Sequence, residues 1–388
     1  MKLFVLLSRF PYPLEKGDKL RAFHFIQELA KQHDIYLCCL SDQPVNEHQI
    51  QKIKPLTKEL HVFQQSKAIT YFNTAVQFFT DKPYQKGYFY QRGIQKKINE
   101  LIQRIQPDHI FCQLIRTAEY VKDFHTIPKT IDYMDALARG MFRRGEIAKG
   151  LAKKMYLSEG KRLAVYENRI FDYFNHHVII SSQDKKCIQH PDAEKIHVIE
   201  NGIGEQFLNY TCTQKKEFDL VFVGNLNYAP NIEGSETLVN EVLPELLKKN
   251  IRPSVLIAGA TPHARVLSLQ SDQVTVKSWT EDVRDYYCSG RIFVAPLFIG
   301  TGLQNKLLEA IALHLPCVTT PLVNNALGAK DSESILLAAN PREFADCIAR
   351  LISDTSLAQR IASNGKAYVT STFSWAKAAE KLESVFRS

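Results

Sequence analysis

Residues 295–310 read Ala-Pro-Leu-Phe-Ile-Gly-Thr-Gly-Leu-Gln-Asn-Lys-Leu-Leu-Glu-Ala, and this stretch decides how the second half of the chain folds. Residues 291–295, which are apolar after Arg291, predict a buried strand, and after the glycines the apolar residues recur at helical spacing. Glycines between a strand and a helix let the backbone approach a ligand closely. Because the first turn of a helix has free N–H groups and the positive end of the dipole, the stretch predicts an anion site.

Lys306 and Glu309 lie three residues apart, so they share one face near the start of this helix. The lysine can complement the charge of a phosphate group, and the carboxylate can accept hydrogen bonds from two ribose hydroxyls. A cation for a phosphate beside a carboxylate for a ribose diol is typical of the phosphate and ribose part of a nucleotide site. A surface Lys–Glu pair on an amphipathic helix explains the spacing equally well, and the residues alone leave both interpretations open.

Strands and helices alternate outward from this stretch, as in parallel doubly wound sheets. In the second half we expect strands at residues 219–224, 254–259, 274–277, 291–295 and 317–320, with a helix at 232–247. In the first half we expect them at 2–7, 35–40, 60–63, 109–113, 130–132, 178–181 and 197–199, with a long basic helical region at 139–174. The fold class is therefore α/β, with two Rossmann-like domains, which suits a chain of 388 residues.

Residues 298–320 resemble the donor-binding signature of family 4 glycosyltransferases. Within them, residues 302–310 are similar to a bacterial subgroup of sugar transferases tied to exopolysaccharide or exosortase systems. The resemblance covers nearly the whole chain. The other matching segments, in order, are 11–13 with Gly17, Asp18, Lys19 and Arg21; 198–202; 222–228 with Pro230 and Asn231; and Ser374-Trp375.

The resemblance implies the GT-B fold, in which two Rossmann-like domains face each other across a cleft and a C-terminal helix returns to the first domain. On this basis we expect an N-terminal acceptor-side domain at residues 1–205 and a linker at 206–217. We expect a nucleotide-sugar-binding domain at 218–370 and the crossover helix at 371–388.

The resemblance also implies roles for single residues. Gly17 matches a loop of the first domain that meets the donor phosphates, and Gly224 and Asn225 match the opening toward the pyrophosphate. The remaining donor-binding positions implied in this way are Trp279 and Thr280 beside the base, Gly302, Leu303 and Lys306 at the diphosphate, and Glu309 at the ribose.

Three departures from the family pattern stand out. Thr301 occupies a position where many relatives carry a Glu, and Asn225 and Asn231 replace two basic residues of the diphosphate clamp. Lys306, and Arg21 from the first domain, would then supply the charge, and we count Thr301 among the donor-binding residues.

The catalytic histidine of many relatives has no clear match in this chain. Asp132 and Asp135 occupy that region, and we predict Asp135 nearest the reaction with Asp132 beside it and Lys306 on the donor side. Two ordinary aspartates that cap a helix remain the alternative.

The family implies transfer of a hexose-type sugar from a nucleotide-sugar to a glycan or lipid-linked acceptor, with retention of the anomeric configuration, in surface polysaccharide or glycan biosynthesis. The nucleotide-sugar is a co-substrate, and we expect no cofactor. Because the chain has no Asp-x-Asp, we expect no metal ion. The alternatives are a catalytically impaired nucleotide-sugar-binding partner subunit and a sugar-nucleotide epimerase.

The net charge of +8 lies wholly in residues 1–205, which hold 31 Lys and Arg against 23 Asp and Glu. A basic half suits an anionic partner, and we expect an anionic membrane surface rather than nucleic acid, for which no motif is present. Residues 69–90 hold eight aromatic side chains, which fit either a membrane interface or a buried helical hairpin. Eight scattered cysteines favour free thiols and therefore the cytoplasm. Together with the basic half, this predicts an enzyme that is peripheral on the inner face of the cell membrane.

Overall fold

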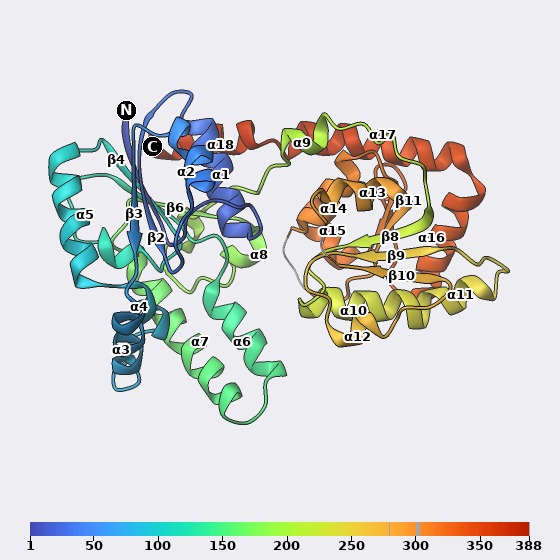
Figure 1. Cartoon of the computed structure of the whole chain (residues 1–388), viewed down its shortest axis with the longest axis horizontal. Coiled ribbons are helices and arrows are strands. Elements are labelled where there is room, and N and C mark those ends of the chain that lie inside the picture. Colours follow the sequence, from blue (N-terminus) through green and yellow to red (C-terminus); the bar gives the residue numbers. More distant parts are fainter. Residues whose placement is uncertain (279, 300–302, 388) are drawn as a thin grey trace. The chain divides into compact units, whose positions relative to one another are not determined.

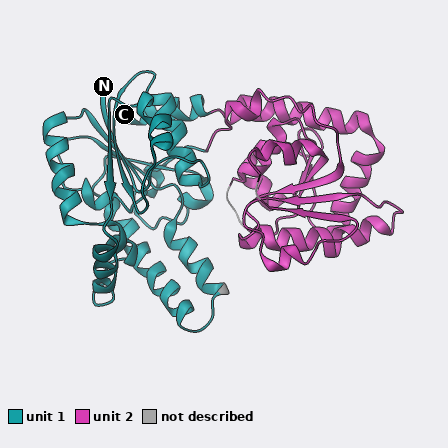
Figure 2. Ribbon diagram, viewed as in Figure 1, with its two compact units in different colours: residues 1–200, 375–388 teal, residues 201–374 magenta. Residues whose placement is uncertain are grey.

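The computed structural model describes residues 1–278, 280–299 and 303–387, and it divides the chain into two compact units (Figure 2). Unit 1 comprises residues 1–200 and 375–388, and unit 2 comprises residues 201–374. Each unit contains one parallel sheet with helices on both faces, so the predicted class of two Rossmann-like domains is confirmed.

The sheet of unit 1 has seven strands in the order β3-β2-β1-β4-β5-β6-β7. The order runs outward from β1 in both directions, which is the doubly wound pattern that alternating strands and helices predict. The strands are β1 Lys2–Leu7, β2 Asp34–Ser41, β3 Glu59–Gln64, β4 His109–Gln113, β5 Lys129–Asp132, β6 His176–Ile179 and β7 His197–Val198.

Helices cover both faces of this sheet (Figure 1). They are α1 Gly17–Leu29, α2 Glu47–Ile53, α3 Lys67–Gln77, α4 Tyr84–Phe89, α5 Arg92–Ile105, α6 Leu137–Ile147, α7 Gly150–Phe171, α8 Ser182–Lys185 and α18 Trp375–Phe386. Successive residues of β1 alternate between the faces, so Val5 packs with α1 and α18 while Phe4 packs with α5 and α7. None of the described helices is long and apolar enough to cross a membrane.

The C-terminal helix α18 belongs to unit 1 and packs against α1, as the resemblance implies. Its first residue, Trp375, is 4% exposed and packs against α1. The indole stacks on His24 with ring centroids 4.7 Å apart and meets the edge of Phe25 at 5.7 Å. Burial under this ring lowers the pKa of His24 to about 4, so the imidazole is neutral at physiological pH.

Trp375→Ala should lower the free energy of unfolding of unit 1 by about 3–5 kcal/mol, because it empties a buried aromatic site between α18 and α1. Urea denaturation of the full chain, followed by circular dichroism, should show one of two transitions shifted to lower urea. Trp375→Phe, which retains most of the stacking, should recover most of the loss. Two equally shifted transitions would contradict the assignment of α18 to unit 1.

The sheet of unit 2 has six strands in the order β10-β9-β8-β11-β12-β13. The strands are β8 Phe218–Val223, β9 Val255–Ala258, β10 Val274–Lys277, β11 Gly290–Ala295, β12 Cys317–Thr319 and β13 Leu336–Leu337. The helices are α9 Glu205–Leu208, α10 Ala229–Thr237, α11 Leu243–Leu247, α12 Ala264–Leu267, α13 Val283–Ser289, α14 Asn305–Ala312, α15 Pro321–Leu327, α16 Pro341–Ser353 and α17 Thr355–Thr372. A short π-helix at Leu238–Val242 joins α10 to α11, and the sequence does not predict the two-residue strand β13.

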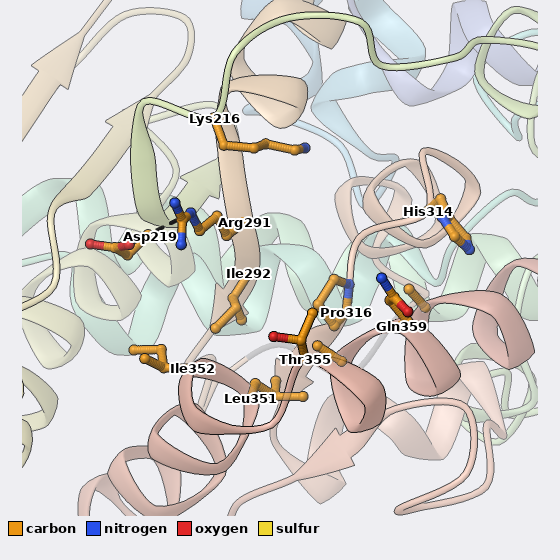
Figure 3. Close-up of a pocket in the computed structure, with 12 residues that line it drawn as sticks. Lys216, Asp219, Arg291, Ile292, His314, Pro316, Leu351, Ile352, Thr355 and Gln359 are labelled. Atoms are coloured by element: carbon orange, nitrogen blue, oxygen red, sulfur yellow. Dashed lines mark ion pairs between the residues drawn. The ribbon is translucent and has the colours of Figure 1, made fainter.

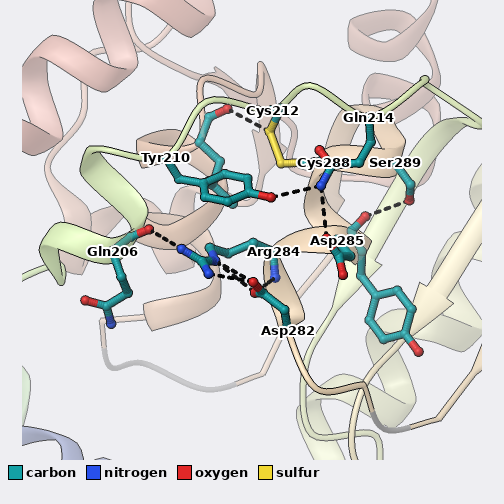
Figure 4. Close-up of a disulfide and its surroundings, with 11 residues drawn as sticks. Gln206, Tyr210, Cys212, Gln214, Asp282, Arg284, Asp285, Cys288 and Ser289 are labelled. Carbon is teal, nitrogen blue, oxygen red and sulfur yellow. Dashed lines mark hydrogen bonds and ion pairs between the residues drawn. A yellow bond between two sulfur atoms is a disulfide. The ribbon is translucent and has the colours of Figure 1, made fainter.

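The region expected to be helical at 139–174 is helical, and it is divided into two helices where the chain turns between α6 and α7 and Gly150 adopts a positive φ of 60°. One sequence expectation needs correction. The expectation that all eight cysteines are free thiols is wrong for one pair, because Cys212 and Cys288 form a disulfide with their Cα atoms 5.3 Å apart (Figure 4). The other six cysteines are free.

Candidate functional site

The predicted donor residues of unit 2 gather at the carboxyl ends of β8 and β11. These two strands are neighbours, and the strand order departs in opposite directions from them. Such a switch point leaves a crevice at the carboxyl edge of a parallel sheet, and ligands bind there in open α/β folds. Gly224 and Asn225 follow β8, whereas Leu303, Lys306 and Glu309 follow β11, so the topology brings both groups to one place.

Gly224 and Lys306 are in direct contact. A Cβ atom at Gly224 would lie 3.1 Å from Cε of Lys306 and 2.8 Å from Nδ2 of Asn231. The missing side chain therefore makes room for the lysine stem. Gly259, at the end of β9, packs still more tightly, because its Cβ would lie 1.7 Å from the carbonyl oxygen of Gly224.

Lys306 lies in the first turn of α14, and its ammonium donates to Oε1 of Gln304 at 2.8 Å. Gln304 is the N-cap residue of this helix and makes no side-chain cap hydrogen bond. Burial lowers the pKa of Lys306 to about 8, while the nearby Glu309 carboxylate acts in the opposite direction. A partly buried cation beside an uncapped helix start is an arrangement that a phosphate group would complete.

Glu309 is held by a residue that sequence reasoning missed. The hydroxyl of Tyr287, on α13, donates to Oε2 of Glu309 at 2.7 Å, and Tyr287 itself is 1% exposed. Burial raises the pKa of the Glu309 carboxyl, and the Tyr287 hydroxyl and the Lys306 ammonium oppose that rise. A carboxylate has about four acceptor positions, so one bond to Tyr287 leaves enough for two ribose hydroxyls.

The segment around Asn225 is arranged by short-range hydrogen bonds. Oδ1 of Asn225 accepts from the backbone N–H of Asn227 at 3.0 Å and from Thr261 at 3.2 Å. Asn231 is buried and donates through Nδ2 to the carbonyl of Asn225 at 2.8 Å, while its Oδ1 has no partner among the described residues. These two asparagines thus shape the loop and contribute no charge to it.

Thr280 follows β10 at the same edge of the sheet, and its hydroxyl donates to the carbonyl of Asp282 at 3.4 Å. Leu303 is partly buried just before α14. Three further predicted donor residues, Trp279, Thr301 and Gly302, lie outside the described residues.

The segment 206–217, expected as a linker, lies in unit 2 and packs on α13 (Figure 4). Besides the disulfide to Cys288, Gln214 donates to Tyr210 at 2.9 Å and to Asp285 at 3.0 Å. The Arg284 guanidinium stacks over the ring of Tyr210 at 4.3 Å. These contacts hold α13 in place against the segment 206–217. Helix α13 in turn places the Tyr287 hydroxyl against Glu309.

In unit 1, Arg21 and Asp132 are brought together, but neither faces solvent. Both side chains are 0% exposed, and Nε of Arg21 donates to Oδ2 of Asp132 at 2.7 Å. Arg21 also donates to the carbonyl of Ile199 at 2.8 Å, and Asp132 accepts from the backbone N–H of Met134 at 3.0 Å. This pair ties α1 to β5, so its burial argues for a supporting role and against the predicted contact of Arg21 with the donor.

Asp135, three residues on, is exposed. The protein atoms crowded around its carboxyl group raise its pKa to about 6, with Asp184 adding to the rise and Arg116 opposing it. Arg116, which sequence reasoning also missed, follows β4; burial and the nearby Arg9 lower its pKa to about 10. Asp135 therefore lies in a charged surrounding at the carboxyl edge of the sheet.

Gly17 opens α1 at this same edge of unit 1 and is exposed. Apart from its chain neighbours and the backbone of its own helix, no described atom lies within 4 Å of where its Cβ would be. No group of three or more His, Cys, Asp or Glu among the described residues is arranged to hold a metal ion.

A pocket of about 390 Å³ in unit 2 is separate from these residues (Figure 3). It is lined by Lys216, Arg291 and Pro316, which lie at or just before the amino ends of β8, β11 and β12, and by residues of α16 and α17. The amino ends of parallel strands form the edge opposite the carboxyl ends. The pocket therefore does not include the donor residues.

Known proteins resemble this chain in sequence and in fold. Residues 217–354 match the family described as "Glycosyl transferases group 1". The chain is 23% identical to an uncharacterized 44.6 kDa protein in the cps region of Klebsiella pneumoniae, over 96% of each chain.

Its fold is similar to that of sucrose-phosphate synthase from Thermosynechococcus elongatus, with a TM-score of 0.70, 14% identity and coverage of 100% and 98% of the two chains. It is also similar to HepE from Anabaena in complex with UDP, with a TM-score of 0.64, 12% identity and coverage of 99% of each. Residues 217–354 are thus similar to group 1 glycosyltransferases, in a chain that has the GT-B fold.

Proposed function

We propose that this chain transfers a hexose-type sugar from a nucleotide-diphosphate-sugar to a glycan or lipid-linked acceptor, in the biosynthesis of a surface polysaccharide or glycan. The observation that carries the proposal is the joint placement of Lys306 and Glu309 at the switch point, with Lys306 against Gly224. A phosphate-binding cation and a diol-binding carboxylate on one helix fit a nucleotide-sugar. The Klebsiella relative lies in a cps region, which supports the polysaccharide role.

The transfer proceeds with retention and without a metal ion in this proposal. The acceptor hydroxyl attacks on the face from which the nucleotide diphosphate departs, and a diphosphate oxygen receives its proton. No protein base is then essential, and the residues orient the substrates and stabilise the developing diphosphate charge. Lys306 and the start of α14 supply that stabilisation, and Asp135 lies closest to the acceptor.

A second candidate is a partner subunit that binds the nucleotide-sugar without transferring it. The neutral Asn225 and Asn231 favour it, since both point into the loop and leave Lys306 as the cation in contact with Gly224. Binding of a donor without turnover would distinguish this candidate from a transferase. An epimerase would instead release an altered nucleotide-sugar in the absence of acceptor.

We also propose that the enzyme works in the cytoplasm, at the inner face of the membrane. The net charge of +8 on residues 1–205 supports attraction to an anionic leaflet.

Glu309→Ala should weaken binding of the nucleotide-sugar roughly tenfold or more, because a charge-assisted hydrogen bond is worth ~1.5–3 kcal/mol. A thermal-shift screen of UDP-, GDP- and ADP-sugars identifies the donor, and calorimetry then measures its affinity. Tyr287→Phe, which frees the carboxylate from its anchor, should cause a smaller loss. Glu333→Ala, a carboxylate paired with Lys330 on the surface, is the matched control and should bind normally.

The same preparation should transfer sugar in excess EDTA, because the diphosphate charge is met by Lys306 and the helix start. Loss of transfer on chelation, restored by Mg²⁺, would contradict the metal-independent chemistry.

For the Glu309→Ala variant, unchanged donor affinity would contradict the assignment of Glu309 to the donor site.

Donor affinity should fall as the pH rises through about 8, because burial lowers the pKa of Lys306 to that value and only its protonated form complements the diphosphate. Well above this pH the fall approaches tenfold per pH unit, as for the loss of one proton. Calorimetry between pH 7 and pH 9 measures it. Lys306→Arg keeps its charge throughout and should remove the pH dependence, and a wild-type slope in this variant would refute the assignment.

Asp132→Ala and Asp135→Ala should have different effects. Removing Asp132 leaves the Arg21 guanidinium buried without its partner and should cost about 3–5 kcal/mol of stability. Asp135→Ala should keep the unfolding transition and lower kcat. In the wild type, kcat should fall as the pH drops below about 6, where Asp135 gains a proton, and Asp135→Asn should lack that dependence.

A further inference from the structure

Helix α3 presents an apolar face to solvent. Ile69, Phe72, Val76 and Phe79 follow one another at helical spacing through α3 and its C-terminal turn, and they are 45%, 69%, 40% and 92% exposed. Tyr71 beside them is 69% exposed. Within α3 the buried residue is Thr70, so the helix contributes little to the core. The alternative of a buried hairpin, which the sequence left open, is wrong for these side chains.

Helix α7 holds the turn after α3 in place. Arg162 donates to the carbonyls of Gln77 at 2.7 Å and of Lys82 at 2.9 Å, while the Glu159 carboxylate accepts from two backbone N–H groups at the start of α4. The α3–α4 hairpin is therefore fixed against α7 and does not hang free. Toward its N-terminus α7 exposes Leu151, at 73%, and Met155, at 40%.

Both hairpins carry a net positive charge, most of it in the α6–α7 hairpin, and Lys86 of the first is paired with Glu119. Residues 67–90 contain three Lys and one acidic residue, and residues 137–165 contain eight Lys or Arg and two acidic residues. Together these two hairpins carry a net charge of +8, equal to that of the whole chain. Within the described part of the chain, no ion pair engages the exposed lysines at positions 67, 82, 149, 153 and 154.

The two hairpins also share one edge of the sheet. The chain enters α3 from the end of β3 and enters α6 from the end of β5, so both hairpins leave the carboxyl edge (Figure 1). Asp135 lies at this edge, directly after β5. Exposed apolar side chains among unpaired lysines suit the interface of an anionic bilayer, where rings enter the headgroup region and lysines meet lipid phosphates.

We propose that α3, the turn that follows it and the tip of the α6–α7 hairpin form one docking surface for an anionic lipid bilayer. The tip comprises Lys149, Leu151, Lys153, Lys154 and Met155. This surface deepens the proposed function by presenting a lipid-linked acceptor to the edge that carries Asp135. It does not depend on transfer, because vesicle binding needs neither donor nor acceptor.

The test is flotation of the full chain with phosphatidylcholine vesicles that contain or lack phosphatidylglycerol. The wild type should float with the anionic vesicles at low salt and detach at about 0.5 M NaCl, where charges are screened beyond a few ångströms. Lys149→Glu with Lys153→Glu and Lys154→Glu should weaken partitioning on the order of 100-fold. Phe72→Ser with Phe79→Ser should weaken it at least about tenfold.

Matched control variants test whether the losses come from this surface or from any change of charge or exposed apolar side chains on the protein. Lys52→Glu with Lys96→Glu and Lys97→Glu makes the same charge change at exposed positions on α2 and α5, and Leu247→Ser with Leu267→Ser removes exposed leucines from unit 2. Both controls should float like the wild type, and all variants should keep the wild-type melting temperature.

The proposal would be overturned if Phe72→Ser with Phe79→Ser floated like the wild type. It would also be overturned if the charge control lost as much vesicle binding as the variant changed from Lys to Glu at positions 149, 153 and 154. A dimer in sedimentation that the Phe72→Ser, Phe79→Ser change dissociates, without vesicle binding, would overturn it in favour of an interface between copies. Transfer to a soluble acceptor, measured separately, reports on the proposed function alone.

Discussion

The contact of Lys306 with the backbone at Gly224 is the constraint on which the candidate donor site depends. The lysine stem occupies the space that a side chain at 224 would fill, and Gly259 lies against the carbonyl of Gly224 where no Cβ fits. Two glycines at adjacent strand ends thus hold the sheet edge open and let a cation reach into it. The same enclosure lowers the pKa of the lysine, so an arriving diphosphate would stabilise a charge that the protein alone stabilises poorly.

Glu309 depends on a different set of contacts. Its orientation is set by Tyr287, and the place of Tyr287 is set by α13, which the segment 206–217 fixes through the disulfide and hydrogen bonds of Gln214. A segment that the sequence analysis expects to be a linker therefore supports the candidate ribose-binding carboxylate through α13. Loss of the disulfide would act on the candidate site through α13 and not through a candidate donor-binding residue.

The sequence predicts most of the fold, because the buried parallel strands are short apolar runs separated by helices of clear periodicity. It predicts the 109–113 and 274–277 strands at their observed bounds. It misses what depends on distant residues meeting in space. Cys212 and Cys288 are 76 residues apart, and Tyr287 and Glu309 are 22 apart, so no local pattern signals either contact. Similarly, nothing near Arg21 in sequence reveals its partner Asp132, and their burial changes the interpretation of both.

Several charged groups with displaced pKa values lie at the carboxyl edges of the two sheets, beside the candidate site residues. In unit 1 they are Asp135, Arg116 and Glu167, whose burial raises its pKa to about 8, and in unit 2 they are Lys306 and Glu309. The buried histidines also have lowered pKa values, yet His24 and His177 stack on aromatic rings in the core, where a neutral imidazole simply packs. Other charged groups of this kind lie elsewhere: Lys129 and Lys216, at or just before the amino ends of β5 and β8, have pKa values lowered by burial. A displaced pKa therefore guides the search for a site only where it meets an open sheet edge. At the carboxyl edges a bound anion or a proton can relieve the cost of crowding a charge with protein atoms, and those edges carry the candidate chemistry in both units.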